Sequence, residues 1–172
     1  MKRYAAFLRG VFTARTKMED LRLAFEEAGF HDVKTLLASG NVVFSAEATP
    51  ASQLERRIES ATEKHFGKPI PAYVHRIATL ERLVASDPFA RFELPRDSKR
   101  IVSFLRKKPA KKLTFPIVRE KARILGVDGT TVYSAYQPQP GNPVFMVLLA
   151  DTFGTAITTR TWETLTKVAG SE

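Results

Sequence analysis

The sequence predicts an α+β protein that opens with a ferredoxin-like β-α-β-β-α-β unit and continues into a smaller, related α+β subdomain. Three observations carry this prediction: strand-like runs at residues 2–9 and 70–77, two helical repeats of apolar residues between them, and a tight hairpin at 33–45. Right-handed crossovers would place both helices on one face of a four-stranded antiparallel sheet. We expect the subdomains to span residues 1–78 and 79–172 and to pack as one compact unit.

The first helix is expected to begin at Thr16, because Thr16-Lys17-Met18-Glu19 has the spacing of a capping box. Apolar residues then recur at helical spacing, and Gly29 supplies a left-handed stop. The apolar positions are Met18, Leu21, Phe25 and Ala28.

The next stretch predicts a hairpin and a second helix. Residues 33–37 and 42–45 are β-branched or apolar runs, joined through the turn Ala38-Ser39-Gly40-Asn41. Thr49-Pro50 opens the second helix, because proline is tolerated in the first turn, and Gly67 closes it. The predicted inner stripe of this helix is Leu54, Ile58, Ala61 and His65.

The second half is less regular. Asp128-Gly129 is a strong turn signal between two strands. The apolar run at 144–153 predicts a buried helix, with a strand as the alternative, because periodicity does not separate the two in a short run. Thr159 is the expected N-cap of the last helix. In chain order we expect a helix at 80–85, a strand at 100–106, strands at 122–127 and 131–136, and helices at 144–153 and 159–168.

The composition is that of an ordinary globular protein of 172 residues. It contains no cysteine, which excludes disulfides, thiolate metal sites and a cysteine nucleophile. The apolar start of the chain is interrupted at Arg9, and the apolar run at 144–150 is far shorter than the roughly 20 residues of a membrane span. We therefore expect a cytoplasmic protein with no membrane partner. No feature of the sequence indicates an oligomeric state.

Positive charge is concentrated in one segment. The net charge is +9, and residues 96–123 hold eleven basic and two acidic residues, so the whole excess lies there. Clustered lysines and arginines are typical of a phosphate-binding or nucleic-acid-binding surface. The alternative is a solvated basic loop that keeps the protein soluble, because the aromatic residues of an RNA-binding sheet are not interleaved with these charges. The candidate nucleic-acid-binding residues are Lys99, Arg100, Arg106, Lys107, Lys108, Lys111 and Lys112.

Three short segments carry candidate ligand-binding residues. Backbone amides at a helix start favour anions, a guanidinium can hold a phosphate through two hydrogen bonds, and an indole ring offers a stacking plane. The alternative for each segment is structural: a capped helix with solvated charges, a hairpin turn, and a packed last helix. The candidates are Arg9, Gly10 and Lys17 before the first helix, Ser39, Gly40 and Asn41 at the hairpin tip, and Thr159, Arg160 and Trp162 near the C-terminus.

Three stretches together resemble the bacterial domain-of-unknown-function 1697 family. They are Tyr4–Gly10, the run Met18–Phe44 with its Thr35-Leu-Leu-Ala-Ser-Gly-Asn-Val-Val-Phe44 core, and the tail Ile157–Leu165. The resemblance covers nearly the full length and is specific in order and spacing. It implies an α+β fold of two related subdomains, and it implies no established activity.

These observations favour a non-catalytic binding protein for a small anionic ligand such as a nucleotide. The alternative is salt-dependent binding of DNA or RNA through residues 96–123, and the third hypothesis is an enzyme with an unrecognised active site. The sequence groups no nucleophile with a base and an orienting residue, and its three histidines are scattered. We therefore predict no catalytic residue, metal site or cofactor.

Overall fold

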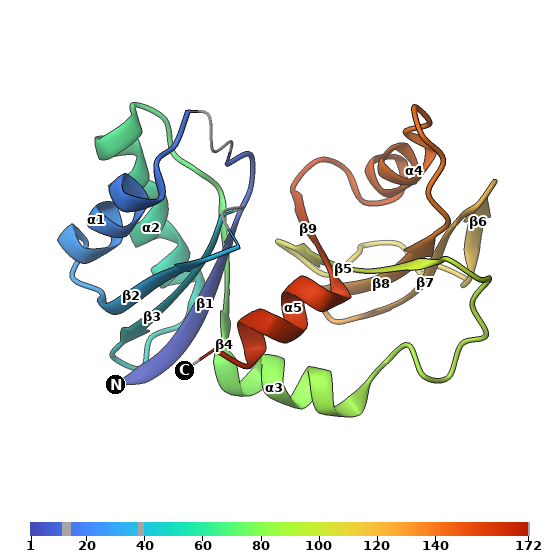
Figure 1. The fold of residues 1–172 in the computed structure, drawn as a ribbon, viewed down its shortest axis with the longest axis horizontal. Helices are drawn as coiled ribbons and strands as arrows, with labels where there is room; N and C mark the ends of the chain where they lie inside the picture. The colour runs from blue at the N-terminus through green and yellow to red at the C-terminus, as the bar shows by residue number, and fades with distance from the viewer. Residues whose placement is uncertain (12–14, 38–39, 172) are drawn as a thin grey trace. The chain divides into compact units, whose positions relative to one another are not determined.

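The computed structural model describes residues 1–11, 15–37 and 40–171 and shows the predicted mixed α+β fold with antiparallel sheets. The chain divides into two units, each built on its own sheet (Figure 1). Unit 1 comprises residues 1–85 and 166–172, and unit 2 comprises residues 86–165. Within the described part of the chain, no helix combines the length and the hydropathy that crossing a membrane requires.

Unit 1 is consistent with the ferredoxin-like prediction. Its strands lie in the order β2-β3-β1-β4, every neighbouring pair is antiparallel, and α1 and α2 cover the same face (Figure 1). The elements are β1 (Lys2–Leu8), α1 (Met18–Glu27), β2 (His31–Leu36), β3 (Asn41–Ala46), α2 (Ala51–Phe66) and β4 (Ala72–Arg76). A further helix, α3 (Ile77–Ser86), follows β4 directly and begins earlier than the predicted residue 80.

The core of unit 1 lies between its sheet and these two helices. Alternate residues of β1 point toward the helices, as the period of a strand requires, and α1 supplies Leu21 and Phe25. Phe25, Phe30 and Phe44 form an aromatic cluster with ring centroids 4.6 to 5.8 Å apart. Close packing of this kind holds α1 on the sheet, and α2 joins the same core through Leu54 and Ile58.

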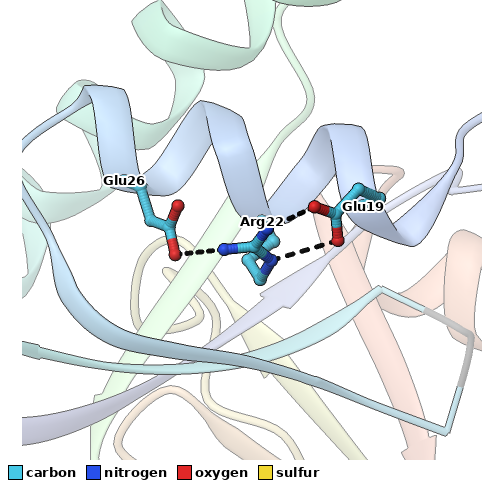
Figure 2. Close-up of polar contacts among 3 residues, drawn as sticks. All are labelled: Glu19, Arg22 and Glu26. Atoms are coloured by element: carbon cyan, nitrogen blue, oxygen red, sulfur yellow. Dashed lines mark hydrogen bonds and ion pairs between the residues drawn. The ribbon is translucent and has the colours of Figure 1, made fainter.

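The predicted capping box of α1 is wrong. The helix is capped at Lys17 rather than Thr16, and no side chain bonds to the free amides of the first turn. Glu19 does not reach back to the cap, because its carboxylate accepts hydrogen bonds from Arg22, which also donates to Glu26 (Figure 2). This exposed i,i+3 and i,i+4 arrangement supports α1 from its outer face.

The inner stripe of α2 differs from the prediction in its last turn. Leu54 and Ile58 are buried as expected, but the third buried residue is Thr62, and Ala61 and His65 are half-buried. Burial of Thr62 is tolerated because its hydroxyl donates to the Glu59 carbonyl at 3.0 Å and accepts from the Ile70 amide at 2.9 Å. His65 instead contacts Glu27 of α1, with Nε2 and Oε2 2.6 Å apart.

Unit 2 holds a five-stranded sheet in the order β6-β7-β8-β5-β9, with α4 packed on one face. The helix at 144–153 and the hairpin across Asp128-Gly129 are confirmed, and the three-residue strand β6 was not predicted. The elements are β5 (Lys99–Leu105), β6 (Ile117–Arg119), β7 (Ala122–Asp128), β8 (Thr131–Tyr136), α4 (Val144–Phe153), β9 (Ile157–Thr161) and α5 (Trp162–Ala169).

The predicted last helix at 159–168 begins too early. Residues 157–161 form β9, which pairs with β5, because the β-branched run Ile-Thr-Thr-Arg-Thr suits a strand. The helix begins at Trp162, and the cap is Thr161, whose hydroxyl oxygen accepts from the Thr164 amide at 3.2 Å. Thr159 therefore lies in a strand and not at a helix start.

Unit 2 repeats the strand order of unit 1. β5, β7, β8, α4 and β9 correspond to β1, β2, β3, α2 and β4, and the two central strands share the sequence Phe-Leu-Arg at their ends. The Leu8 amide donates to the Gly40 carbonyl at 2.8 Å, and the Leu105 amide donates to the Thr130 carbonyl at the same distance. The element without a counterpart is α1, because residues 106–116 contain no helix or strand.

Candidate functional site

An open cavity of about 460 Å³ lies at the end of β5 in unit 2. Its size falls in the range of small-molecule sites, about 300–1,000 Å³. The wall is made by the loop that follows β5 and by the end of α4. The lining residues are Leu105, Arg106, Lys107, Lys108, Pro109, Ala110, Lys111, Leu113, Thr152, Phe153 and Ala156.

The charged part of this lining is entirely positive. Arg106, Lys107, Lys108 and Lys111 contribute cations, and none of the lining residues is acidic. The three lysines are exposed and form no hydrogen bond or ion pair with any residue that the structure describes. Several uncompensated cations around a concave surface produce a positive potential that attracts anions.

The rest of the lining is mostly apolar. Leu105 is buried, Leu113 and Phe153 are half-buried, and the Thr152 hydroxyl donates to the Leu148 carbonyl at 2.8 Å. Because this bond is internal to α4, Thr152 offers its hydrogen to the helix and not to the cavity. The cavity therefore combines an apolar floor with a cationic mouth.

The cavity exists because unit 2 lacks a counterpart of α1. In unit 1, Leu8 is buried beneath a core that includes Leu21 and Phe25 of α1. Leu105 holds the same position in β5, but there it forms part of the cavity floor. The loop at 106–116 contains Pro109 and Pro116 and five basic residues without an acidic one, a composition that disfavours a helix.

A second hollow of about 260 Å³ borders the same loop. It shares Lys108, Pro109, Lys111 and Leu113 with the first cavity. Its remaining lining residues are Phe115, Val127 and Gly129. The basic loop thus stands between two adjoining hollows.

A family model described as "Protein of unknown function (DUF1697)" matches residues 1–133, which is more than half of the chain. The chain belongs to the DUF1697 family. No curated protein matches this DUF1697 chain, and the family description assigns no activity.

A solved structure shares the fold of the DUF1697 chain. It is the structure of conserved bacterial protein SP0830 from Streptococcus pneumoniae, with a TM-score of 0.71 and 18% sequence identity. The match covers 98% of this chain and 97% of the other. At this identity the similarity shows the fold alone.

The structure divides the predicted nucleic-acid-binding residues of the DUF1697 chain into two groups. Lys99 and Arg100 begin β5, whereas Arg106, Lys107, Lys108, Lys111 and Lys112 follow its other end. Six residue steps of about 3.3 Å separate the two ends by about 20 Å. Arg119, Lys121 and Arg123 lie at the Lys99 end, because Lys99 and Ala122 both pair with Tyr136.

Two of the arginines at the Lys99 end have a partner or a packing role. The Arg119 guanidinium lies 2.7 Å from the Asp151 carboxylate, and the Arg100 guanidinium lies over the Phe89 ring at 5.9 Å. Lys112 is exposed in the basic loop but does not line the cavity. Arg106, Lys107, Lys108 and Lys111, from the group after β5, line the concave surface.

The predicted residues of unit 1 lie at the equivalent end of its sheet. Arg9 and Gly10 are exposed just after β1, and Lys17 is exposed at the start of α1. Gly40 is required by the turn, because its φ is +78° and a Cβ would lie 3.1 Å from the Leu8 carbonyl oxygen. Ser39 lies outside the described residues.

Asn41 has a structural role in unit 1. Its side chain is 1% exposed, and Nδ2 donates to the Leu36 carbonyl at 3.2 Å across the β2–β3 hairpin. A buried amide that is bonded to the backbone stabilises the turn.

The predicted C-terminal group lies on β9 and at the start of α5. The Arg160 guanidinium donates to the Thr158 hydroxyl and to the Thr159 carbonyl, both at 2.9 Å, and burial lowers its pKa to about 10. The Thr159 hydroxyl bonds with that of Ser103 at 2.9 Å. Trp162 is 7% exposed and packs edge-on against Phe89, with ring centroids 5.2 Å apart. Trp162 is therefore a packing residue of unit 2.

Sequence reasoning identified the cations of the cavity and missed its apolar floor. The predictions place Leu105 in a strand and Phe153 in a helix, and they assign no role to Leu113. One signal for this floor is present in the sequence, because the motif Phe-Leu-Arg occurs twice. The copy at residues 7–9 precedes a predicted helix, whereas the copy at 104–106 precedes a basic loop that contains proline. The described residues contain no group of three or more histidines or carboxylates that could hold a metal ion.

Proposed function

We propose that this DUF1697 protein binds a small anionic ligand in the cavity at the end of β5. The observation that carries the proposal is the lining itself: four cations, no carboxylate, and a concave surface of about 460 Å³. Charge-assisted hydrogen bonds from lysine and arginine to phosphate or carboxylate oxygens are among the strongest that proteins make. No nucleophile, base and orienting residue line the cavity, which supports binding without catalysis.

Nucleic acid is a weaker candidate for this surface. A duplex that followed the whole segment 96–123 would have to contact both ends of β5, about 20 Å apart. At the Lys99 end, Arg119 is engaged with Asp151 and Arg100 with Phe89. A concave site favours a small ligand, whereas a nucleic-acid footprint favours an extended cationic stripe.

The test is a calorimetric titration of the full chain with pyrophosphate and with ADP at low salt. The double variant Lys108→Gln, Lys111→Gln should weaken binding by about tenfold or more, which corresponds to about 1.4 kcal/mol. The matched control is Lys99→Gln, Lys121→Gln, which removes the same charge from the same unit at the other end of β5 and should change binding less than about twofold.

Two outcomes would contradict the proposal. One is the absence of binding by either anion at low salt. The other is an equal loss of affinity in both double variants, which would mean that net charge rather than the cavity attracts the anion. A parallel titration with short duplex DNA tests the nucleic-acid hypothesis. If DNA contacted the whole of residues 96–123, both double variants would bind DNA more weakly and their affinity would depend less on salt.

A further inference from the structure

We infer that the ligand of this cavity carries at least two negative charges on an apolar body, as organic diphosphates do. The inference rests on the proposed function, since it names the class of anion that the same site would take. Two features of the lining carry it: the number of cations and the extent of the apolar floor.

The number of cations requires a polyanion. Arg106, Lys107, Lys108 and Lys111 line one cavity, and no acidic residue offsets them there. Like charges that line one cavity repel one another, and a ligand with one negative charge would leave most of that repulsion in place. A diphosphate group presents several charged oxygens that three flexible lysines can reach together.

The floor requires an apolar group beside the charge. Leu105, Leu113, Phe153 and Ala156 line the cavity together with Pro109 and Ala110. An inorganic anion held at the exposed lysines would leave this floor in contact with water, whereas an apolar body would cover it and gain the free energy of burial.

The second hollow extends the surface available to such a body. Lys108, Lys111 and Leu113 border both hollows, and the second one adds Phe115 and Val127. A ligand whose charged group lies at Lys108 and Lys111 can therefore place apolar atoms on either side of Leu113. Nucleoside and alkyl diphosphates share this chemistry, since one carries a flat base and the other a chain.

The experiment compares three probes by calorimetry at low salt: pyrophosphate, ADP and octyl diphosphate. At least one of the two organic diphosphates should bind about tenfold or more tightly than pyrophosphate. If ADP is preferred, the apolar part of the ligand is a nucleoside. If octyl diphosphate is preferred, it is an alkyl chain. Equal affinity for all three probes would overturn the inference while leaving the proposed function intact, and no binding of any probe would overturn both.

Variants of Leu113 provide the second arm. Leu113 lies in the cavity and outside the buried core cluster of unit 2, so its replacement should leave the fold unchanged. Leu113→Ser should weaken the preferred organic probe about fivefold more than it weakens pyrophosphate, and Leu113→Ile should retain the preference. A Leu113→Ser protein that unfolds at the wild-type temperature and keeps the full preference would contradict the assigned floor.

Discussion

The two units share one strand order and differ in what covers it. In unit 1, α1 lies on the sheet and buries Leu21, Ala24 and Phe25. In unit 2, residues 106–116 replace that helix and carry five basic residues and two prolines. A repeated topology can therefore lack one packed helix and keep its sheet, and the uncovered strand end then becomes part of a cavity.

The largest difference should appear in the contribution of these two segments to stability. Leu21→Ala removes a fully buried side chain from α1 and should lower the free energy of unfolding by about 3 kcal/mol. Leu113→Ala, in the loop that replaces α1, should cost less than about 1 kcal/mol because Leu113 is only half-buried. Urea unfolding followed by circular dichroism measures both values. Equal costs would mean that the loop packs as tightly as the helix.

The next difference concerns pH. His75 in β4 and Arg160 in β9 hold equivalent positions, opposite Ala5 and Val102. Burial lowers the pKa of His75 to about 4 from its ordinary value of 6.5. Between pH 6.5 and 4 the unfolded chain therefore binds a proton that the folded chain does not, so the free energy of unfolding falls as the pH falls through this window, by at most about 3 kcal/mol.

The quantity to compare is the slope of the free energy of unfolding against pH, rather than the free energy at one pH. His75→Gln should reduce the fall in the free energy of unfolding between pH 6.5 and 4. Urea unfolding at several pH values measures this fall. Arg160 keeps its charge throughout that window, because its pKa is lowered only to about 10. Arg160→Gln should therefore leave the slope unchanged. If the slope of His75→Gln equals that of the wild type, His75 is not the source of the pH dependence.

The smallest effect is expected inside the sheet of unit 2. Ser134 is fully buried, and its hydroxyl has no hydrogen-bond partner among the described residues, whereas the equivalent position in unit 1 is Phe44. Ser134→Ala should stabilise the protein by up to about 1 kcal/mol, because it removes an unsatisfied polar group. Ser103→Ala is the matched control and should cost about 1 kcal/mol, since Ser103 bonds with Thr159. A rise in melting temperature for Ser134→Ala and a fall for Ser103→Ala would support this comparison. A lower melting temperature for both variants would contradict it.

The sequence was sufficient to predict the framework of unit 1 and the class of the whole fold. Strong apolar periodicity identified α1 and α2, and the turn at 38–41 identified the hairpin, because these signals are local. The capping box failed because Glu19 has a competing partner in Arg22, which the local motif does not include. The strand β9 was missed because its pairing with β5 is decided by residues more than 50 positions away.

The candidate site was predictable only in part for the same reason. The charges of residues 96–123 are evident in the sequence, but their separation into two groups depends on the direction and length of β5. The apolar floor depends on a helix that is missing from unit 2, and an absence of this kind is recognised only once the two units have been compared strand by strand.

The division of the chain has a consequence for how the protein can be dissected. Unit 2 is an insertion in unit 1, since the chain leaves unit 1 at Ser86, the last residue of α3, and returns to it at residue 166. Val168 and Ala169 are buried, so the returning segment is part of the packed structure and not a loose tail. Removal of the last residues would open a closed loop of about 80 residues, and the entropy of closing such a loop grows only slowly with its length. The insertion could therefore tolerate changes in length within its surface loops while both of its attachments are kept.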